Sequence, residues 1–191
     1  MAQTQIKKEL IDASFGNILE QIVYRADGRT ITTTQGDITV ENVTASQTGT
    51  TSHVAITGST IDYTPPSGAL GVYYEFAFNI KNIDANTLYH LKVQLDNSSG
   101  TLTDITESRR SYYAPDLRDF WIRSEAYIRI NGVEDVANEQ VGTWDSARTI
   151  TTTFRVYSTA YEGAAHGLYH FDGASDSTRY VKPIVKITAY S

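Results

Sequence analysis

The side chains best suited to hold a metal ion are two histidines near the C-terminus, His166 and His170. On a helix, residues with this spacing lie on one face and can ligate one zinc ion. Here they flank Gly167–Tyr169 within a pattern typical of a strand, where residues spaced this way lie about 13 Å apart. One ion cannot bridge that distance unless the chain turns. We therefore expect no metal site, and no motif indicates a cofactor.

Other residues that could do chemistry form weak patterns. The segment 96–100, Asp-Asn-Ser-Ser-Gly, resembles part of a calcium loop but lacks the alternating oxygen ligands, so a hairpin turn explains it. Gly-rich phosphate loops and the Gly-x-Ser-x-Gly motif are absent, and the lack of cysteine excludes thiol catalysis. Glu134–Asp135, or Asp116 with Asp119, could flank a glycosidic bond, but nothing distinguishes them from loop charges. We expect that the protein is not an enzyme.

Alternation of apolar and polar residues dominates the chain after position 52. From Val72 to Ile80 every second residue is large and apolar, which is the period of a strand with one buried face. The pattern recurs to the C-terminus, and Gly, Pro and Asn separate the runs. The expected strands are 53–57, 60–63, 71–81, 89–96, 121–131, 148–158, 167–171 and 182–190. This spacing predicts an all-β protein, an antiparallel jelly-roll sandwich over residues 52–191.

The first 25 residues have a different pattern. Four large apolar residues follow a spacing of four, three and four, which a helix would place on one side: Ile11, Phe15, Ile18 and Ile22. We interpret residues 1–25 as an attachment arm, partly helical or irregular and ordered by contact with a neighbour. A short helix folded onto its own domain is the alternative. Residues 26–51 carry turn signals and Thr-rich segments that predict a short β-hairpin followed by a linker.

Composition limits the partners. The chain has 191 residues, a formal net charge of −6 and no cysteine. An acidic surface disfavours binding to nucleic acid, because phosphate contacts need clustered Lys and Arg. The N-terminal residues lack an apolar signal core, and no apolar run reaches the length of a membrane span. We expect a protein made in the cytoplasm with neither nucleic acid nor membrane as a partner.

The segment 102–119 is expected to be a long loop, and long loops on a rigid β frame often carry function. It combines arginine with tyrosine, a mixture favoured at protein interfaces. A strand crossover packed on its own sandwich is the alternative. The candidate interface or receptor contacts are Arg109, Arg110, Tyr112, Tyr113, Trp121 and Trp144. Each tryptophan could instead lie in the core or at a subunit interface.

The segment 56–69, with its run Tyr63-Thr-Pro-Pro-Ser-Gly-Ala69, followed by the strand 72–78, resembles jelly-roll virion proteins of tailed bacteriophages. The resemblance extends over residues 52–191, where the later segments match in pattern only, and 102–119 does not map clearly. It implies a domain like the tumour-necrosis-factor jelly roll, which usually assembles as a trimer about a threefold axis. It also implies that the N-terminal segment attaches each copy to the particle, and it supplies no site residues.

Two hypotheses follow. In the first, the protein is a homotrimeric capsid decoration or head-fibre protein of a virion, made in the host cytoplasm, whose partners are its own copies and the major capsid or another virion protein. The residues expected to dock the arm are Ile11, Phe15, Ile18 and Ile22. In the second, it is a tail-fibre tip or receptor-binding module for host surface glycan. The residues that could stack on sugar rings are Tyr112, Tyr113, Trp121 and Trp144.

Overall fold

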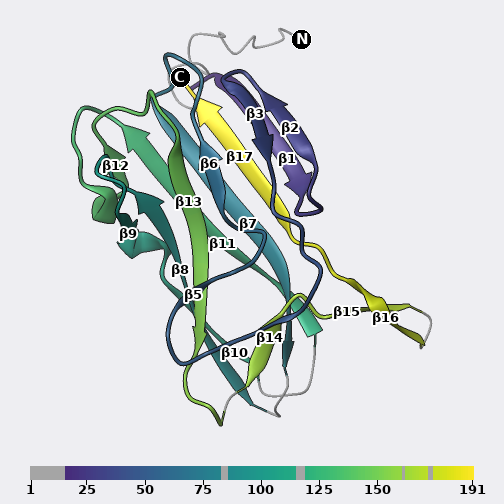
Figure 1. Cartoon of the computed structure of the whole chain (residues 1–191). Helices are drawn as coiled ribbons and strands as arrows, with labels where there is room; N and C mark the ends of the chain where they lie inside the picture. The colour runs from purple at the N-terminus through teal and green to yellow at the C-terminus, as the bar shows by residue number, and fades with distance from the viewer. Residues whose placement is uncertain (1–15, 83–85, 115–118, 161, 172–173) are drawn as a thin grey trace, which may run out of the picture.

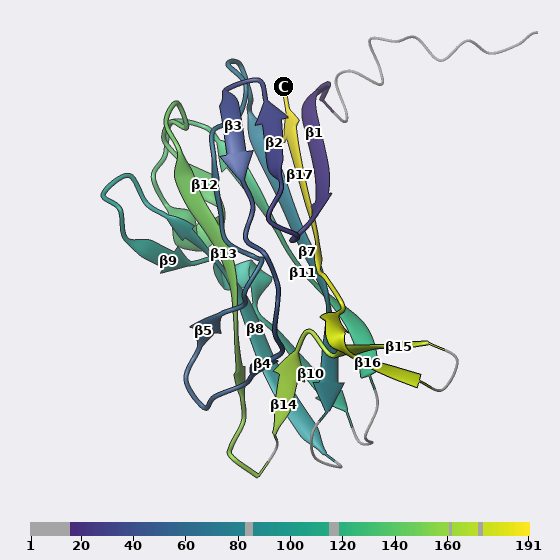
Figure 2. The same cartoon turned by 45° about the vertical axis from the view of Figure 1, so that its right-hand side comes forward.

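The computed structural model describes residues 16–82, 86–114, 119–160, 162–171 and 174–191, without the side chains at 82, 114, 168–171 and 174–178. Over these residues two sheets lie face to face as a sandwich, seen in Figures 1 and 2. All strand pairs are antiparallel except one short parallel pair at a sheet edge. The expected all-β jelly-roll sandwich is therefore confirmed.

A seven-stranded sheet forms one layer, with β7 at its centre. Its main strands, in spatial order, are β1 (Ile18–Arg25), β17 (Ile184–Tyr190), β7 (Gly71–Asn82), β11 (Asp119–Ile130) and β12 (Gln140–Val141). Two short strands complete it: β14 (Gly163–Ala165) pairs with β7 and with β4 (Gln47–Thr48). The long β7–β11 pair has an uninterrupted register from Gly71↔Arg129 to Lys81↔Asp119.

A six-stranded sheet forms the other layer. Its strands are β10 (Arg110–Ala114), β8 (Thr87–Asp96), β13 (Arg148–Val156), β5 (Val54–Ala55), β6 (Ile61–Tyr63) and β9 (Leu102–Asp104). β8 alternates strictly between buried and half-buried residues over its ten positions, as the sequence pattern predicts. Its inward residues, among them Tyr89 and Leu91, face those of β7, such as Phe76 and Phe78, in one core.

The first strand corrects the expected secondary structure of the arm. Ile18–Arg25 is β1, paired along its length with β17, and is neither helical nor irregular. A β-bulge at Leu19 places Ile18 on the solvent side of the sheet and Ile22 in the core, although in a regular strand the two would share a face. Ile11 and Phe15 lie outside the described residues, so the docking role of the arm stays a prediction.

Two hairpins lie outside the main sheets. β2 (Thr30–Thr33) and β3 (Gly36–Thr39) form the hairpin expected within residues 26–51, and Ile31 and Ile38 pack against the core. This hairpin lies beside β1 and β17 (Figure 1). β15 (Leu168–Phe171) and β16 (Ala174–Tyr180) project away from one end of the sandwich in Figures 1 and 2.

The segment 102–119 is largely structured rather than a long loop. Its described part contains β9, the single-turn 3-10 helix η1 (Thr106–Ser108) and β10, and both strands pair with β8. The alternative of a crossover packed on its own sandwich is therefore confirmed for residues 102–114. A second single turn, η2 (Val136–Asn138), precedes β12. No helix in the described part of the chain is long and apolar enough to cross a membrane.

Candidate functional site

The six sequence-predicted contact residues do not gather at one place. Trp121 projects from β11 on the solvent side of the seven-stranded sheet. Arg109 and Arg110 lie at the start of β10, on the other sheet, where Arg109 pairs with Asp104 at 3.3 Å. Trp144 follows β12 and enters the core. A single binding surface made of all six residues is therefore ruled out by the fold.

Trp144 is a core residue, which corrects its expected role as an exposed contact. Its side chain is buried, and its Nε1–H donates to the carbonyl oxygen of Tyr63 at 2.8 Å. The two rings meet edge to face with centroids 6.3 Å apart. Satisfying the indole donor inside the core is the usual condition for burying tryptophan, so this ring is not available to stack on a sugar.

The two tyrosines of β10 point in opposite directions, as strand geometry requires. Tyr112 is half-buried between the sheets, and its hydroxyl donates to the carbonyl oxygen of Arg123 at 3.0 Å. Tyr113 is exposed, and its hydroxyl donates to Oδ1 of Asn86 at 2.8 Å. Tyr112 therefore joins the two layers at the sheet edge, whereas the ring of Tyr113 can meet a partner.

The solvent side of the seven-stranded sheet carries the main group of exposed apolar side chains. We call it the outer sheet face: the outward residues of β1, β17, β7 and β11. It includes Ile18, Val23, Tyr73, Trp121, Tyr127 and Tyr190. Ile18 is 59% exposed, Val23 61%, Trp121 49% and Tyr127 43%. Such a cluster on one face is typical of an interaction surface, whereas single exposed apolar residues are ordinary.

Hydrogen bonds and charges order the centre of the outer sheet face. The hydroxyl of Tyr73 lies 3.0 Å from Oε2 of Glu75 and 2.9 Å from Oε2 of Glu125. Arg123 pairs with Glu75 at 3.4 Å, and the Lys186 ammonium lies 6.0 Å from the centroid of the Tyr73 ring. Burial, followed by the two carboxylates, raises the pKa of Tyr73 above its ordinary value, so its hydroxyl remains a donor.

Tyr127 shows why a glycine begins β7. A Cβ built on Gly71 would lie 2.5 Å from the Tyr127 hydroxyl oxygen, so the hydroxyl end of the phenol ring lies against the glycine. The rings of Tyr127 and Tyr190 are 6.3 Å apart and tilted by 57°. These contacts fix the aromatic side chains while leaving their outer surfaces in solvent, which lowers the entropy lost when a partner binds.

The histidines considered for a metal site in the sequence are His166 and His170. The described residues contain no group of three or more His, Cys, Asp or Glu side chains placed to hold an ion. His166 is buried, with Nε2 2.8 Å from the carbonyl oxygen of Thr57. The side chain of His170 lies outside the described set. His166 is thus a core residue, and its protonation affects the stability of the fold.

Sequence reasoning did not single out Val23 or Tyr127 as candidate contact residues. For Tyr127 the signal was present, because it belongs to the outward series Arg123, Glu125, Tyr127 of the expected strand. For Val23 the run Ile22-Val-Tyr24 is typical of a strand. The helical spacing of the apolar residues up to Ile22, however, favoured a partly helical arm. Only the pairing with β17 shows that this segment is a strand, and the local sequence does not reveal that pairing.

Comparison with known proteins identifies no family. No protein-family model and no curated protein matches the chain. Among solved structures, infectious bursal disease virus, Gx strain, matches at a TM-score of 0.38 with 10% identity, over 91% of this chain and 37% of that one. TmCBM27, a carbohydrate-binding module that recognises mannan, matches at 0.38 with 9% identity, over 92% and 97%. A Clostridium thermocellum xylanase 10B fragment complexed with xylohexaose matches at 0.35 with 11% identity, over 90% and 25%.

Proposed function

We propose that the protein is a structural subunit of a tailed-bacteriophage virion, assembled as a homotrimer that decorates the capsid or forms a head fibre. The observation that carries the assembly step is the outer sheet face, where exposed apolar and aromatic side chains cover a sheet with no layer packed on it among the described residues. The sequence resemblance of residues 52–191 to jelly-roll virion proteins supports the location in the particle.

A second copy of the chain suits the outer sheet face better than an unrelated acidic or basic partner. The chain as a whole is acidic, with a net charge of −6, so two copies repel each other over most of their surfaces. The outer sheet face carries cations such as Lys186 and Arg123 beside the carboxylates Glu75 and Glu125. Charges of both signs around a tyrosine-rich centre allow copies to approach there without that repulsion.

A threefold ring gives each copy two different contact patches, since its contacts are heterologous. Around such an axis, the β1–β17 side of one outer sheet face meets the β11 side of the next. The arrangement also covers β1, which lies at the edge of the seven-stranded sheet. Covering an edge strand removes a row of unpaired backbone groups that would otherwise invite aggregation.

The test of assembly is the native mass of the full chain and of a face variant. The wild type is expected at three times the 21.2 kDa chain mass. Val23→Glu combined with Tyr127→Glu adds charge to the outer sheet face and should give monomers. Leu102→Glu is the control, because Leu102 is an exposed apolar residue on the other sheet. A monomeric wild type at high concentration would disprove the assembly, and a double variant that remains trimeric would place the interface elsewhere.

Glycan recognition is the second candidate function. It is favoured by the half-exposed ring of Trp121 on β11 and by the exposed ring of Tyr113. Binding to a glycan array that is lost in Trp121→Ala would support it. Equal binding by wild type and Trp121→Ala would remove Trp121 from the site.

A further inference from the structure

A hollow of about 330 Å³ on the six-stranded sheet concentrates positive charge in an otherwise acidic protein. Its lining residues include the carboxylate Asp104 and four basic residues: Lys92, Arg109, Arg110 and Arg155. We call it the basic hollow. It faces solvent on the opposite layer from the outer sheet face, so its role is independent of the proposed assembly.

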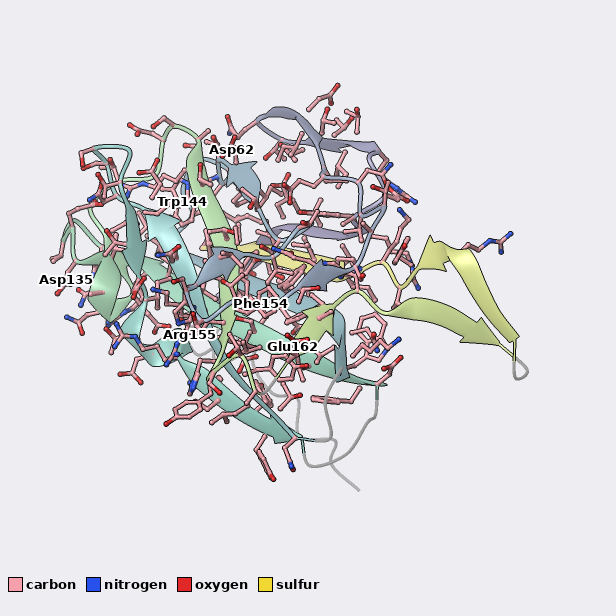
Figure 3. The ribbon with its side chains drawn as sticks, turned by 60° about the horizontal axis from the view of Figure 1, so that its bottom comes forward. Asp62, Asp135, Trp144, Phe154, Arg155 and Glu162 are labelled. Carbon is pink, nitrogen blue, oxygen red and sulfur yellow. The ribbon has the colours of Figure 1, made fainter. Side chains whose placement is uncertain are left out.

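Strand register builds the floor of the basic hollow. Ser111 on β10, His90 on β8 and Arg155 on β13 lie directly opposite one another across three neighbouring strands. Side chains in such cross-strand positions start about 5 Å apart, so the three form one continuous row. The Ser111 hydroxyl lies 2.9 Å from Nδ1 of His90. Figure 3 labels Arg155 and, before it on β13, the buried core residue Phe154.

Internal pairing leaves an excess of positive charge. Asp104 lies 2.7 Å from the Lys92 ammonium and 3.3 Å from the Arg109 guanidinium, and it also accepts from Nε2 of Gln94 at 2.8 Å. Within the described residues, no ion pair involves Arg155 or Arg110. Arg110 lies opposite the core residue Leu91, so its side chain leaves β10 on the other face from Ser111, where it donates to the backbone carbonyls of Glu107 and Arg109.

The pKa values of the two histidines in the basic hollow reflect the same positive charge. Burial, followed by the charges of Lys92 and Arg155, lowers the pKa of His53 to about 4. Burial and then Arg155 lower the pKa of His90 below its ordinary value. Both rings are therefore neutral at pH 7, and the fixed cations dominate the hollow.

An exposed aromatic ring lies beside the hollow. Tyr157, which follows β13, is 56% exposed, and its ring centroid is 6.4 Å from that of His90. A cationic row next to an exposed aromatic face is the combination that recognises a sugar ring bearing a charged substituent. The guanidinium fork binds the oxyanion, and the aromatic face covers the apolar face of the sugar.

From these contacts we infer that the basic hollow binds an anionic sugar residue, with a sulfate, phosphate or carboxylate group held by Arg155 and Ser111 and the sugar ring against Tyr157. A volume of about 330 Å³ suits one sugar unit rather than a long polymer. The negative charge of the rest of the chain opposes an extended polyphosphate, which favours a saccharide over nucleic acid.

The experiment is calorimetric titration of the full chain at low salt with a sulfated heparin hexasaccharide, a polygalacturonate oligomer, neutral dextran, inorganic phosphate, inorganic sulfate and single-stranded DNA. We expect one of the acidic saccharides to bind, the inorganic ions to bind more weakly and dextran not to bind. Arg155→Gln should weaken binding about tenfold or more. Arg29→Gln changes an exposed arginine that immediately precedes β2; it is the matched control and should bind as the wild type does.

Three results would overturn the inference: no binding by the wild type to any anionic saccharide, an equal loss in Arg29→Gln and Arg155→Gln, or DNA binding that exceeds saccharide binding. Inorganic ions that bind as tightly as the saccharides would show that the hollow recognises only the oxyanion. That result would overturn the sugar part of the assignment. Arg155 lies away from the outer sheet face, so the Arg155→Gln variant should have the same native mass as the wild type. This separates the binding test from the test of assembly.

Discussion

The guanidinium of Arg148 forms a two-point ion pair with the carboxylate of Glu134, with Nη1–Oε1 at 2.7 Å and Nη2–Oε2 at 3.1 Å. The Arg148 side chain is only 6% exposed and also donates to the carbonyl oxygens of Asp96 and Thr143. Glu134 in turn accepts from the backbone N–H of Gly142. One buried cation therefore fixes β13, the end of β8 and the loops around β12 relative to one another.

Glu134→Gln should destabilise the fold by about 2 kcal/mol, because it leaves a buried guanidinium without its counter-charge. Chemical denaturation at pH 7 measures this. Glu107→Gln is the control, since Glu107 is an exposed carboxylate and its substitution should leave stability within about 0.5 kcal/mol of the wild type. A Glu134→Gln midpoint equal to that of the control would show that the pair contributes nothing.

The same pair predicts a pH dependence. The hydrogen bonds from Arg148 lower the pKa of Glu134 from 4.5 to about 2. A carboxyl with a depressed folded-state pKa stabilises the fold fully above its unfolded pKa, and this stabilisation is lost as the pH falls toward the folded value. The difference in unfolding free energy between wild type and Glu134→Gln should therefore shrink between pH 5 and pH 2.5. A difference that is constant over this window would contradict the prediction.

Sequence reasoning located the main strands because their apolar positions alternate. Val72, Phe76 and Ile80 were expected to share a buried face, and all three are fully buried. It could not place β1, because the spacing of Ile18 and Ile22 also suits one side of a helix, and only the pairing with β17 shows that the segment is a strand. The burial of Trp144 also could not be predicted without the fold, because the carbonyl that accepts from its indole belongs to Tyr63, which is distant in the sequence.

The basic hollow shows a further limit of the sequence. Arg109 and Arg110 were visible as a basic pair, but Lys92 and Arg155 are separated along the chain and meet them only because β10, β8 and β13 are neighbours. A cross-strand cluster needs the strand order, which alternation does not supply. The sequence therefore showed a basic pair, and its grouping with Lys92 and Arg155 had to come from the sheet.

His166 predicts a loss of stability at mildly acidic pH. Burial lowers its pKa from 6.5 to about 4, and its Nδ1 is buried without a hydrogen-bond partner among the described residues. The unfolded chain then binds the proton more readily than the folded one, so stability falls as the pH drops from 6.5 toward 4. The loss from this group should be on the order of 2 kcal/mol at pH 5.

The control for this pH effect is His166→Asn. Asparagine tolerates the left-handed backbone of this position, where φ is 62°, and does not titrate. The variant should be less stable at pH 7, yet its unfolding free energy should change less between pH 7 and pH 5 than that of the wild type. Identical slopes for the two proteins would show that another group controls the transition.

Two glycines form a matched pair for testing core packing. A Cβ on Gly163 would lie 1.7 Å from the hydroxyl oxygen of Tyr89, whose side chain is fully buried. A Cβ on Gly71 would meet the end of the exposed Tyr127 ring, which can move into solvent. Gly163→Ala should therefore cost about 2–3 kcal/mol, and Gly71→Ala less than about 1 kcal/mol. Thermal unfolding of both variants measures the two losses of stability, and equal losses would contradict this prediction.

Two N-terminal deletions separate folding from attachment. Removing residues 1–25 deletes β1, taking the buried Ile22 and Tyr24 from the core and the Glu20 carboxylate from the Tyr63 hydroxyl, 2.8 Å away. Burying two large apolar side chains contributes about 3 kcal/mol or more, so this protein should be strongly destabilised. Removing residues 1–15 leaves β1 intact and should preserve both stability and native mass.

The shorter deletion is thus the correct test of the arm. If residues 1–15 attach the subunit to the particle, the deletion variant should fold and assemble but be missing from purified virions. Ile11→Ser combined with Phe15→Ser in the full chain should lower incorporation in the same direction without changing thermal stability. Quantitative mass spectrometry of virions measures this. Normal incorporation of the 1–15 deletion would show that attachment uses the folded domain, and the exposed Ile18 at the start of β1 would then be the next residue to change.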